Sequence, residues 1–405
     1  MKYVVLIGDG MADYPIAEKG GKTPLELAAT SCMDMLAQKG TLGLVHTIPE
    51  GLDPGSDVAN LAAMGYDPRK YYSGRAPIEA ASIGVPLADT DIAFRCNLVT
   101  LADKDGGLWM DDYSAGHIAT AEAAQVIEGL KKTLDSSDII FYPGVSYRHL
   151  MVWKNGTDKL KTTPPHDISG RKIDAYLPSG EGAERIRQLM ELSRAVLPGM
   201  EISKQRAARG DKAVSSIWLW GQGRALEIPR FVDLHGISGS VISAVDLVKG
   251  LGLCAGLASI DVPGATGYLD TNYAGKVSAA LRALESGDFV YVHVEAPDEA
   301  SHKGSFTEKI QAIEDFDSRI VRPMLEGLEK RFAEFKVLVM PDHPTPLCTK
   351  THASDPVPFI LYDSASGDNK INKQRAYCEK DALAAGIVVD EGALLMDKFI
   401  KGAAL

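Results

Sequence analysis

The side chains in this sequence that could do chemistry gather in four short segments. Ser56 lies in a Gly-Ser-Asp turn that opens a predicted helix, and its hydroxyl is a candidate nucleophile. The other segments contain carboxylates and imidazoles that could bind a metal ion. These candidate ligands are Asp9, Asp298, His302, Asp342, His343 and His352. Mixed oxygen and nitrogen ligands suit Zn, Mn or Fe better than Ca or Mg alone.

These ingredients fit phosphoryl transfer. Two divalent ions roughly 4 Å apart could clamp the attacking and the leaving oxygen of a phosphate ester. One ion would lower the pKa of the Ser56 hydroxyl and make its alkoxide accessible near neutral pH. Backbone amides at the start of the following helix would face the phosphate and add partial positive charge. The pattern therefore favours a two-metal phosphotransfer enzyme with Ser56 as the nucleophile.

Each of these residues has a more ordinary explanation when it is considered alone. An Asp after a strand is usually a helix N-cap or a turn residue, and Gly-Ser-Asp before a helix is first of all a capping sequence. A lone His more often packs or lies on the surface than binds a metal. Three of the nine histidines, however, fall beside Asp residues near predicted strand ends. This coincidence, rather than any single residue, supports a metal site.

The elements that must position these residues alternate between strand and helix. Helical patterns at residues 272–287 and 308–332 separate runs of apolar residues late in the chain. This alternation predicts an α/β fold with a layered, mostly parallel sheet. The apolar runs that predict buried strands are residues 3–7, 289–296, 336–340 and 358–362.

Such a sheet would bring the candidate ligands together. Ligands of open α/β sheets bind beyond the carboxyl ends of the strands, and Asp9, Asp298 and Asp342 all follow predicted strands. Asp298 and His302 are four residues apart, so one helical turn would place them on one face. We therefore expect these residues to converge although they are far apart in the sequence.

The middle of the chain predicts a separate domain. Strand-like pieces alternate there with two helical patterns, residues 119–134 and 182–197, and no convincing metal ligand occurs among them. We expect a core built from residues 1–77 and 238–405. Residues 78–237 would form a smaller α+β cap domain inserted into that core.

Composition narrows the class of protein. The chain of 405 residues has a net charge of −11, which disfavours nucleic acid and anionic membranes as partners. Its five scattered cysteines include no CxxC pair and fit a reducing compartment. No apolar run approaches the ~20 residues needed to span a bilayer. We expect a cytoplasmic protein that acts on a small phosphorylated substrate, and assembly into a homo-oligomer is left open.

Several motifs resemble one family over nearly the whole chain. They are VVLIGDGMADYP, GSDVANLAAMGYDP, HVEAPDEASHKG, MPDHPTP and THASDPVPF. Together they resemble the archaeal-type, cofactor-independent phosphoglycerate mutases, which belong to the alkaline phosphatase superfamily. The terminal segments carry the resemblance specifically, whereas the middle is looser. It implies an alkaline-phosphatase-like core with an inserted cap.

The resemblance also implies two metal sites and a route for the phosphate. Asp9, Ser56, Asp342 and His343 match the positions that hold one ion, and Asp298, His302 and His352 match those that hold the other. The ions would be Mn²⁺ first of all, with Zn²⁺, Co²⁺ or Mg²⁺ as alternatives. The phosphate would pass from phosphoglycerate to Ser56 and return to the other oxygen, which interconverts 2- and 3-phosphoglycerate.

Four basic residues are candidates for binding the substrate. Arg148, His117 and Arg224 lie in the expected cap, and Lys276 in Asn-Tyr-Ala-Gly-Lys resembles the family's substrate lysine. Their ordinary explanation is a solvated surface charge. In the archaeal mutases the position of His117 is commonly Arg, whereas the longer bacterial mutases have His there. This departure leaves the phosphate acceptor open.

Three other functions remain as alternatives. Bacterial proteins close to this pattern have been proposed as homoserine kinases, but no GxxxxGK[ST] motif occurs, so ATP would have to bind without a P-loop. A metal-binding protein without catalysis would not need the Ser56 turn. A simple phosphatase would result if the cap did not exclude water.

Overall fold

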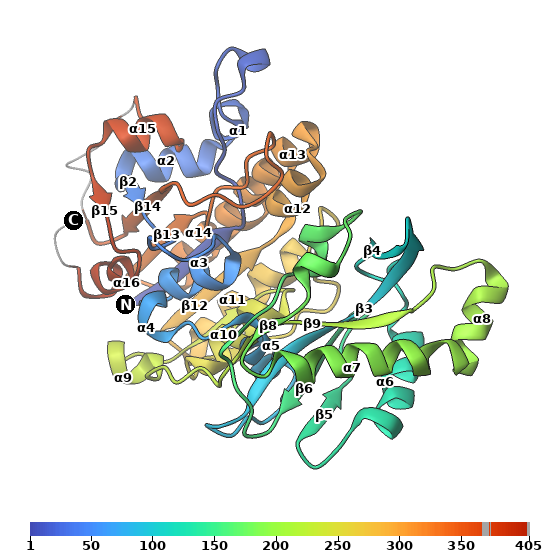
Figure 1. The fold of residues 1–405 in the computed structure, drawn as a ribbon. Coiled ribbons are helices and arrows are strands. Elements are labelled where there is room, and N and C mark those ends of the chain that lie inside the picture. The colour runs from blue at the N-terminus through green and yellow to red at the C-terminus, as the bar shows by residue number, and fades with distance from the viewer. Residues whose placement is uncertain (367–371, 373, 403–405) are drawn as a thin grey trace. The chain divides into compact units, whose positions relative to one another are not determined.

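The computed structural model describes residues 1–366, 372 and 374–402. The chain forms two compact units (Figure 1). Unit 1 comprises Met1–Tyr72 and Glu227–Leu405, and unit 2 comprises Ser73–Leu226. Among the described helices, none is both long and apolar enough to cross a membrane.

Unit 1 is built on an eight-stranded sheet in the order β11-β10-β12-β1-β13-β14-β2-β15. All neighbouring strands pair in parallel except at β14, which is antiparallel to both β13 and β2. The predicted α/β fold with a mostly parallel sheet is therefore confirmed. The strands are β1 (Lys2–Gly8), β2 (Thr41–Val45), β10 (Gly239–Ile242), β11 (Ala258–Ser259), β12 (Phe289–Val294), β13 (Phe335–Met340), β14 (Val357–Asp363) and β15 (Val388–Val389).

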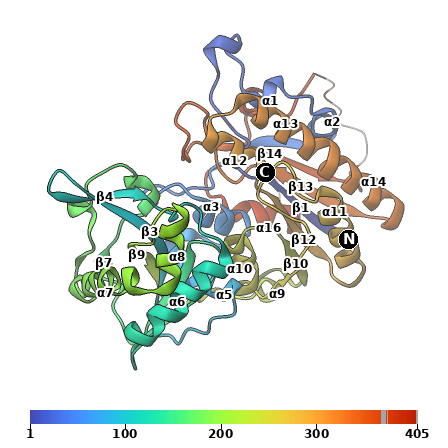
Figure 2. The ribbon, with the colours of Figure 1, turned by 90° about the vertical axis from the view of Figure 1, so that its right-hand side faces the viewer.

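The central strands are apolar because helices cover both faces of this sheet. Val4 to Ile7 of β1 are completely buried, as a central parallel strand requires. Figure 2 shows α13 and α14 on one side of the strands and α10 and α16 on the other. The helices of unit 1 are α1 (Pro24–Leu27), α2 (Ser31–Lys39), α3 (Ser56–Ala63), α4 (Pro68–Tyr71), α9 (Phe231–His235), α10 (Asp246–Cys254), α11 (Tyr273–Ser286), α12 (Ala296–Lys303), α13 (Phe306–Phe316), α14 (Arg322–Arg331), α15 (Glu379–Ala384) and α16 (Ala393–Lys401).

Two details of unit 1 differ from the simplest expectation. The strand predicted at 358–362 runs antiparallel, because residues 341–356 form a loop without the helix that a parallel crossover usually needs. The single helix predicted at 308–332 is broken into α13 and α14 by a π-helical turn, η5 (Asp317–Val321).

Unit 2 is a smaller α+β unit around an antiparallel sheet. Its order is β4-β3-β6-β5, with β9 also paired to β3, and helices α6 and α7 pack with it in one apolar core. The elements are α5 (Arg75–Ser82), β3 (Ile92–Lys104), β4 (Gly107–Asp112), α6 (Thr120–Leu134), β5 (Ile139–Tyr142), β6 (Arg148–Trp153), β7 (Leu160–Lys161), β8 (Ser179–Gly180), α7 (Ala183–Val196), α8 (Glu201–Arg209) and β9 (Ser216–Gly223).

The boundaries of the two units lie earlier in the chain than 77/78 and 237/238. Helix α5 belongs to unit 2 because it packs on β3 and β9. Helix α9 belongs to unit 1, where the ring of Phe231 lies 4.4 Å from that of Phe289 in β12. These tertiary contacts, which the sequence pattern does not reveal, place the boundaries.

Candidate metal centre

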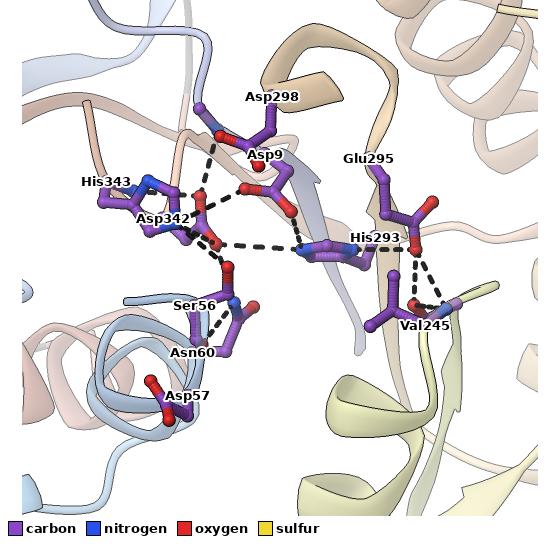
Figure 3. A network of polar contacts seen from close by, with 12 residues as sticks. Asp9, Ser56, Asp57, Asn60, Val245, His293, Glu295, Asp298, Asp342 and His343 are labelled. Carbon is purple, nitrogen blue, oxygen red and sulfur yellow. Dashed lines mark hydrogen bonds and ion pairs between the residues drawn. The ribbon is translucent and has the colours of Figure 1, made fainter. Parts of the chain in front are cut away.

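The predicted ligand residues meet at the carboxyl edge of the unit 1 sheet. Asp9 follows β1, Asp342 and His343 follow β13, and Asp298 lies in α12 directly after β12. Ser56 is the first residue of α3 and points toward the same place (Figure 3). Because β12, β1 and β13 are neighbours in the sheet, their carboxyl ends bring these side chains together.

One group of side chains surrounds Nε2 of His343. This nitrogen lies 3.0 Å from Oγ of Ser56, 3.5 Å from Oδ1 of Asp9 and 3.5 Å from Oδ2 of Asp342. The two carboxylates and the imidazole are buried and close enough together to hold a metal ion. We call Asp9, Ser56, Asp342 and His343 the Asp9 cluster.

A second group, the Asp298 cluster, consists of Asp298, His302 and His352. Oδ2 of Asp298 lies 3.0 Å from Nε2 of His302 and 3.6 Å from Nε2 of His352. The two imidazole Nε2 atoms are 3.1 Å apart. His343 adjoins this cluster as well, since its ligand atoms and those of Asp298 and His352 all lie within 4.8 Å of one another. The two candidate sites are therefore adjacent.

Burial and neighbouring charges set the protonation of these groups. Burial and the carboxylate of Asp342 raise the pKa of Asp9. Burial would also raise the pKa of Asp298, but the two histidines of its cluster hold that pKa well below its usual range. Burial lowers the pKa of His343, so its imidazole is neutral near pH 7 and has a lone pair for a metal ion.

Hydrogen bonds hold Asp342 in place. Its Oδ1 accepts the backbone N–H groups of Gly10 and His343, at 3.1 and 2.9 Å. Its Oδ2 accepts a hydrogen bond from Nδ2 of Asn60 at 2.7 Å. The Tyr291 hydroxyl donates in turn to Oδ1 of Asn60 at 2.6 Å. Asn60 lies one helical turn after Ser56, so α3 positions both the hydroxyl and this carboxylate.

A buried ion pair that sequence reasoning missed joins the two loops that carry the ligands. Nζ of Lys309 is completely buried and donates to Oδ2 of Asp13 at 2.8 Å and to the carbonyl of Thr345 at 2.9 Å. Asp13 also accepts the backbone N–H of Leu347. The loop after β1 is thereby tied to the loop after β13. Asp13 follows Asp9 within one of the quoted motifs, but nothing in the sequence pairs it with Lys309.

A second missed group lies behind the Asp9 cluster. His293, at the end of β12, is buried, with Nδ1 3.2 Å from Oε1 of Glu295 and Nε2 3.4 Å from Oδ2 of Asp9. Burial opposes protonation of His293, but its contacts with Asp342 and Glu295 raise its pKa to about 9. The available signal was a histidine that interrupts an apolar strand, since a buried polar residue needs a partner.

The structure places Lys276, a candidate for binding the substrate, in a buried ion pair. Its side chain is completely buried, and Nζ donates to the carbonyl of His293 at 2.7 Å and to Oε2 of Glu295 at 3.2 Å. An ammonium group held in this way would have to break a buried ion pair to reach a substrate, which is costly. Lys276 is thus paired with Glu295 in this structure, and its contact with the substrate stays a prediction.

The other three substrate candidates belong to unit 2, where two of them contact the same aromatic ring. The ring of His117 and the guanidinium of Arg148 both lie against Tyr147, at 5.9 and 5.8 Å from its ring centroid. Arg224 instead donates from Nε to Oδ2 of Asp158 at 3.1 Å. The structure thus groups His117 with Arg148 and gives Arg224 a different partner.

The donor set of the centre fits a divalent metal ion. Oδ1 of Asp9 is buried and has no hydrogen-bond partner among the described residues, although an unpaired buried carboxylate oxygen is costly. Oxygen and imidazole ligands in two adjacent groups suit Mn²⁺, Zn²⁺ or Co²⁺. The arrangement could place two ions beside the hydroxyl of Ser56, which is the geometry of two-metal phosphoryl transfer.

Comparisons with known proteins agree with this chemistry. Residues 37–203 match the family model described as "2,3-bisphosphoglycerate-independent phosphoglycerate mutase". A Geobacter sulfurreducens protein named "Probable 2,3-bisphosphoglycerate-independent phosphoglycerate mutase" is 54% identical over 400 residues, which cover 99% of this chain and 100% of that protein. A Methanothrix thermoacetophila protein, named as such a mutase without that qualifier, is 52% identical over 402 residues, with 99% and 100% coverage. The solved structure "Structure of PH0037 protein from Pyrococcus horikoshii" matches with a TM-score of 0.82 at 26% identity, and covers 100% of this chain and 98% of that one.

Proposed function

This chain belongs to the family of 2,3-bisphosphoglycerate-independent phosphoglycerate mutases, and we propose that it interconverts 2-phosphoglycerate and 3-phosphoglycerate through a phosphoserine on Ser56. The observation that carries the phosphoserine is the position of the Ser56 hydroxyl. It lies 3.0 Å from Nε2 of His343, at the start of a helix and beside two groups of metal-ligand side chains.

In the proposed reaction, Oγ of Ser56 bonds to phosphorus while the bond between phosphorus and the glycerate oxygen breaks. The proton of the hydroxyl ends on the released glycerate oxygen, so no other reactant is consumed. The reverse transfer to the other glycerate oxygen frees Ser56. In the first turn of α3, Asp57 accepts the backbone N–H of Val58, which leaves the N–H groups of Ser56 and Asp57 to donate to the phosphate oxygens.

The two clusters would hold the divalent ions. Asp9, Ser56, Asp342 and His343 would bind one ion, and the Asp298 cluster would bind the other. Bound there, the ions would neutralise the phosphate charge and lower the pKa of the Ser56 hydroxyl. We propose Mn²⁺ as the native metal, with Zn²⁺, Co²⁺ or Mg²⁺ as alternatives, because the ligands are nitrogen and oxygen without sulfur.

Unit 2 would act as the cap that retains the glycerate. Arg148 can bind a carboxylate through two parallel hydrogen bonds, and both Arg148 and His117 lie against Tyr147. The backbone of His117 has a φ of 51°, a conformation that costs energy in a residue other than glycine and that is common at binding sites. Retaining the glycerate and excluding water would favour transfer over hydrolysis.

A direct assay separates this function from the homoserine kinase alternative, which gains no support from the relatives above. The purified protein, supplied with Mn²⁺, is followed by ³¹P NMR with 3-phosphoglycerate alone and, separately, with homoserine and ATP. We expect 2-phosphoglycerate in the first reaction and no phosphohomoserine in the second. Phosphohomoserine without 2-phosphoglycerate would overturn the proposal, and the Ser56→Ala variant controls for contaminating activity.

A further inference from the structure

We propose that His293 is a positioning residue, held by Glu295 and Lys276, which orients the Asp9 carboxylate so that one oxygen faces the metal. The inference rests on the proposed metal centre but not on the identity of the substrate. It assigns a role to three buried residues outside both ligand clusters, of which His293 and Glu295 are seen in Figure 3.

Each carboxylate of the centre has one oxygen that faces a side-chain donor. Oδ2 of Asp342 accepts Nδ2 of Asn60, and Oδ1 of Asp298 accepts the hydroxyl of Thr345 at 2.5 Å. Oδ2 of Asp9 faces Nε2 of His293 at 3.4 Å. Oδ2 of Asp342 is farther from the same nitrogen, at 3.8 Å, and already accepts a hydrogen bond from Asn60. We infer that His293 orients the carboxylate of Asp9, as the amide of Asn60 orients Asp342 and the hydroxyl of Thr345 orients Asp298.

Sheet register brings His293 to this position. In the parallel pairing of β1 with β12, His293 lies opposite Ile7, two residues before Asp9. Its ring therefore approaches the Asp9 carboxylate from the side of the sheet rather than from the substrate side. A donor placed there can hold one carboxylate oxygen and leave the other free for the metal.

The imidazole is itself held from its other edge. Nδ1 lies 3.2 Å from Oε1 of Glu295, and Nε2 faces Oδ2 of Asp9. Ionised carboxylates only accept hydrogen bonds, so His293 donates from both ring nitrogens as an imidazolium. Oε1 of Glu295 also accepts the hydroxyl of Ser243 at 2.7 Å and the backbone N–H of Val245 at 3.2 Å. Oε2 accepts Nζ of Lys276. These donors hold the Glu295 carboxylate in one orientation, and Glu295 in turn fixes the orientation of the His293 ring.

The other oxygen of Asp9, Oδ1, is left free to bind a metal ion. This oxygen lies 3.5 Å from Nε2 of His343 and has no hydrogen-bond partner among the described residues. Nε2 of His293 likewise is buried without a partner of good hydrogen-bond geometry in the described part of the chain. Both atoms are satisfied if Asp9 turns Oδ1 to a metal ion and moves Oδ2 closer to His293. Groups behind metal ligands commonly orient them in this way.

Two substitutions at one position test the role. The amide nitrogen of Gln can replace Nε2 of His293 and still donate to Asp9, whereas Asn has its amide near the position of Nδ1 and cannot reach Asp9. We expect His293→Asn to weaken Mn²⁺ binding by about 10- to 100-fold, and His293→Gln to recover most of the affinity. Free Mn²⁺ is measured by EPR during titration of the metal-free protein, which requires no turnover.

Controls separate positioning from folding and from direct ligation. His235 is another buried histidine of unit 1, with Nδ1 3.3 Å from Asp397, and His235→Gln should leave Mn²⁺ affinity unchanged. Glu295→Gln should weaken Mn²⁺ binding in the same direction as His293→Asn. At saturating Mn²⁺, kcat of His293→Gln should return to within a few-fold of wild type, since the reacting atoms are not altered.

Three outcomes would overturn the inference. A folded His293→Asn variant with wild-type Mn²⁺ affinity would show that His293 does not position Asp9. An equal loss of Mn²⁺ affinity in His293→Gln and His293→Asn would show the same. Loss of one imidazole from the Mn²⁺ electron spin-echo spectrum of His293→Gln would make His293 a ligand instead. If the wild type binds Mn²⁺ and the variants weaken binding as expected, but no 2-phosphoglycerate forms, the proposed function fails and this inference stands.

Discussion

At the scale of single residues, the notable feature of Ser56 is that it begins α3 rather than capping it. The N-cap is Gly55, and Ser56 is the first helical residue. A serine at the N-cap would use its hydroxyl to accept a backbone N–H of the helix. Here the hydroxyl is instead 3.0 Å from His343, and Asp57 accepts the N–H of Val58. A shift of one residue therefore leaves the hydroxyl free for chemistry.

The first prediction follows from this geometry. Ser56→Ala should lower the interconversion of phosphoglycerates by several orders of magnitude, because a methyl group cannot accept the phosphate. The measurement is kcat for 2-phosphoglycerate formation, together with ³²P incorporation into protein after acid quenching. A Ser56→Ala enzyme that retains most of its kcat would end the nucleophile proposal, and Ser301→Ala, at a buried serine outside both clusters, is the control.

A second prediction at this scale concerns Arg148. A mutase must hold the glycerate carboxylate after the phosphate has left, so Arg148→Ala should reduce isomerisation and increase the fraction of substrate hydrolysed to free phosphate. Loss of one charge-assisted contact costs roughly 1.5 to 3 kcal/mol, or about ten- to a hundredfold in kcat/KM. Arg224→Ala is the matched control, because Arg224 is paired with Asp158 and should leave the product ratio unchanged. A normal ratio of products in Arg148→Ala would contradict the assignment.

At the scale of elements, the π-helical turn between α13 and α14 supplies a cap to another helix. Thr30 at the N-terminus of α2 makes no side-chain capping bond in the described structure. Instead, Asp317 in the π-helical turn accepts the backbone N–H groups of Cys32 and Met33, at 3.2 and 2.7 Å. A negative carboxylate also interacts favourably with the positive end of the α2 dipole. Asp317 thus takes the place of a side-chain cap from the N-cap residue of α2.

The third prediction tests this capping interaction. Asp317→Ala should lower the free energy of unfolding of unit 1 by about 2 kcal/mol, since two buried N–H groups lose their acceptor. The change is followed by scanning calorimetry. Glu285→Ala, which removes an exposed ion pair with Arg331, should cost less than about 0.5 kcal/mol. Equal effects of the two substitutions would show that Asp317 does not cap α2.

At the scale of the whole molecule, the two units can be observed separately. All four tryptophans, Trp109, Trp153, Trp218 and Trp220, lie in unit 2, whereas both ligand clusters lie in unit 1. Tryptophan fluorescence therefore follows the unfolding of unit 2 alone. Metal binding should stabilise unit 1, which has buried carboxylates that repel one another without an ion.

The fourth prediction concerns metal removal. Dialysis against EDTA should abolish phosphoglycerate interconversion, and Mn²⁺, Zn²⁺ or Co²⁺ should restore it. Because the ion binds only the folded state, a metal concentration 100 times the Kd should stabilise unit 1 by about 2.7 kcal/mol. Calorimetry of metal-free and Mn²⁺-loaded protein measures this difference. Full turnover after exhaustive dialysis would contradict the two-metal proposal.

The fifth prediction concerns the acid sensitivity of unit 2. Burial lowers the pKa of His149 to about 3, so below its ordinary value of 6.5 the unfolded state binds a proton that the folded state excludes. The contribution of the neutral imidazole to the free energy of unfolding is therefore complete above pH 6.5 and decreases as the pH falls toward 3. At pH 4 the free energy of unfolding should be lower by about 3 kcal/mol. His149→Asn keeps an acceptor for the N–H of Gly144 and should flatten this dependence in fluorescence-monitored unfolding. If the free energy of unfolding of His149→Asn depended on pH as steeply as that of the wild type, the prediction would be wrong.

The sequence by itself determined which elements form and which residue types could bind metal. Apolar runs such as residues 3–7 depend on local composition, and parallel strands must be apolar because both of their faces are buried. Asp9 and Asp342 directly follow such strands, so their convergence could be inferred from the carboxyl-edge rule alone. Motifs spread over both ends of the chain indicated the family before any contact was known.

Only the tertiary structure decided how those residues are supported. Lys309 meets Asp13, and Asp317 meets α2, across almost 300 residues of chain, and no local pattern encodes such pairings. The sequence shows that His293 lies in an apolar strand but does not show which group it contacts. Its contact with Asp9 follows only from the pairing of β1 with β12. Lys276 is interpreted from the sequence as a substrate ligand or a surface cation because a sequence gives charge but not burial, and only packing places its ammonium against Glu295.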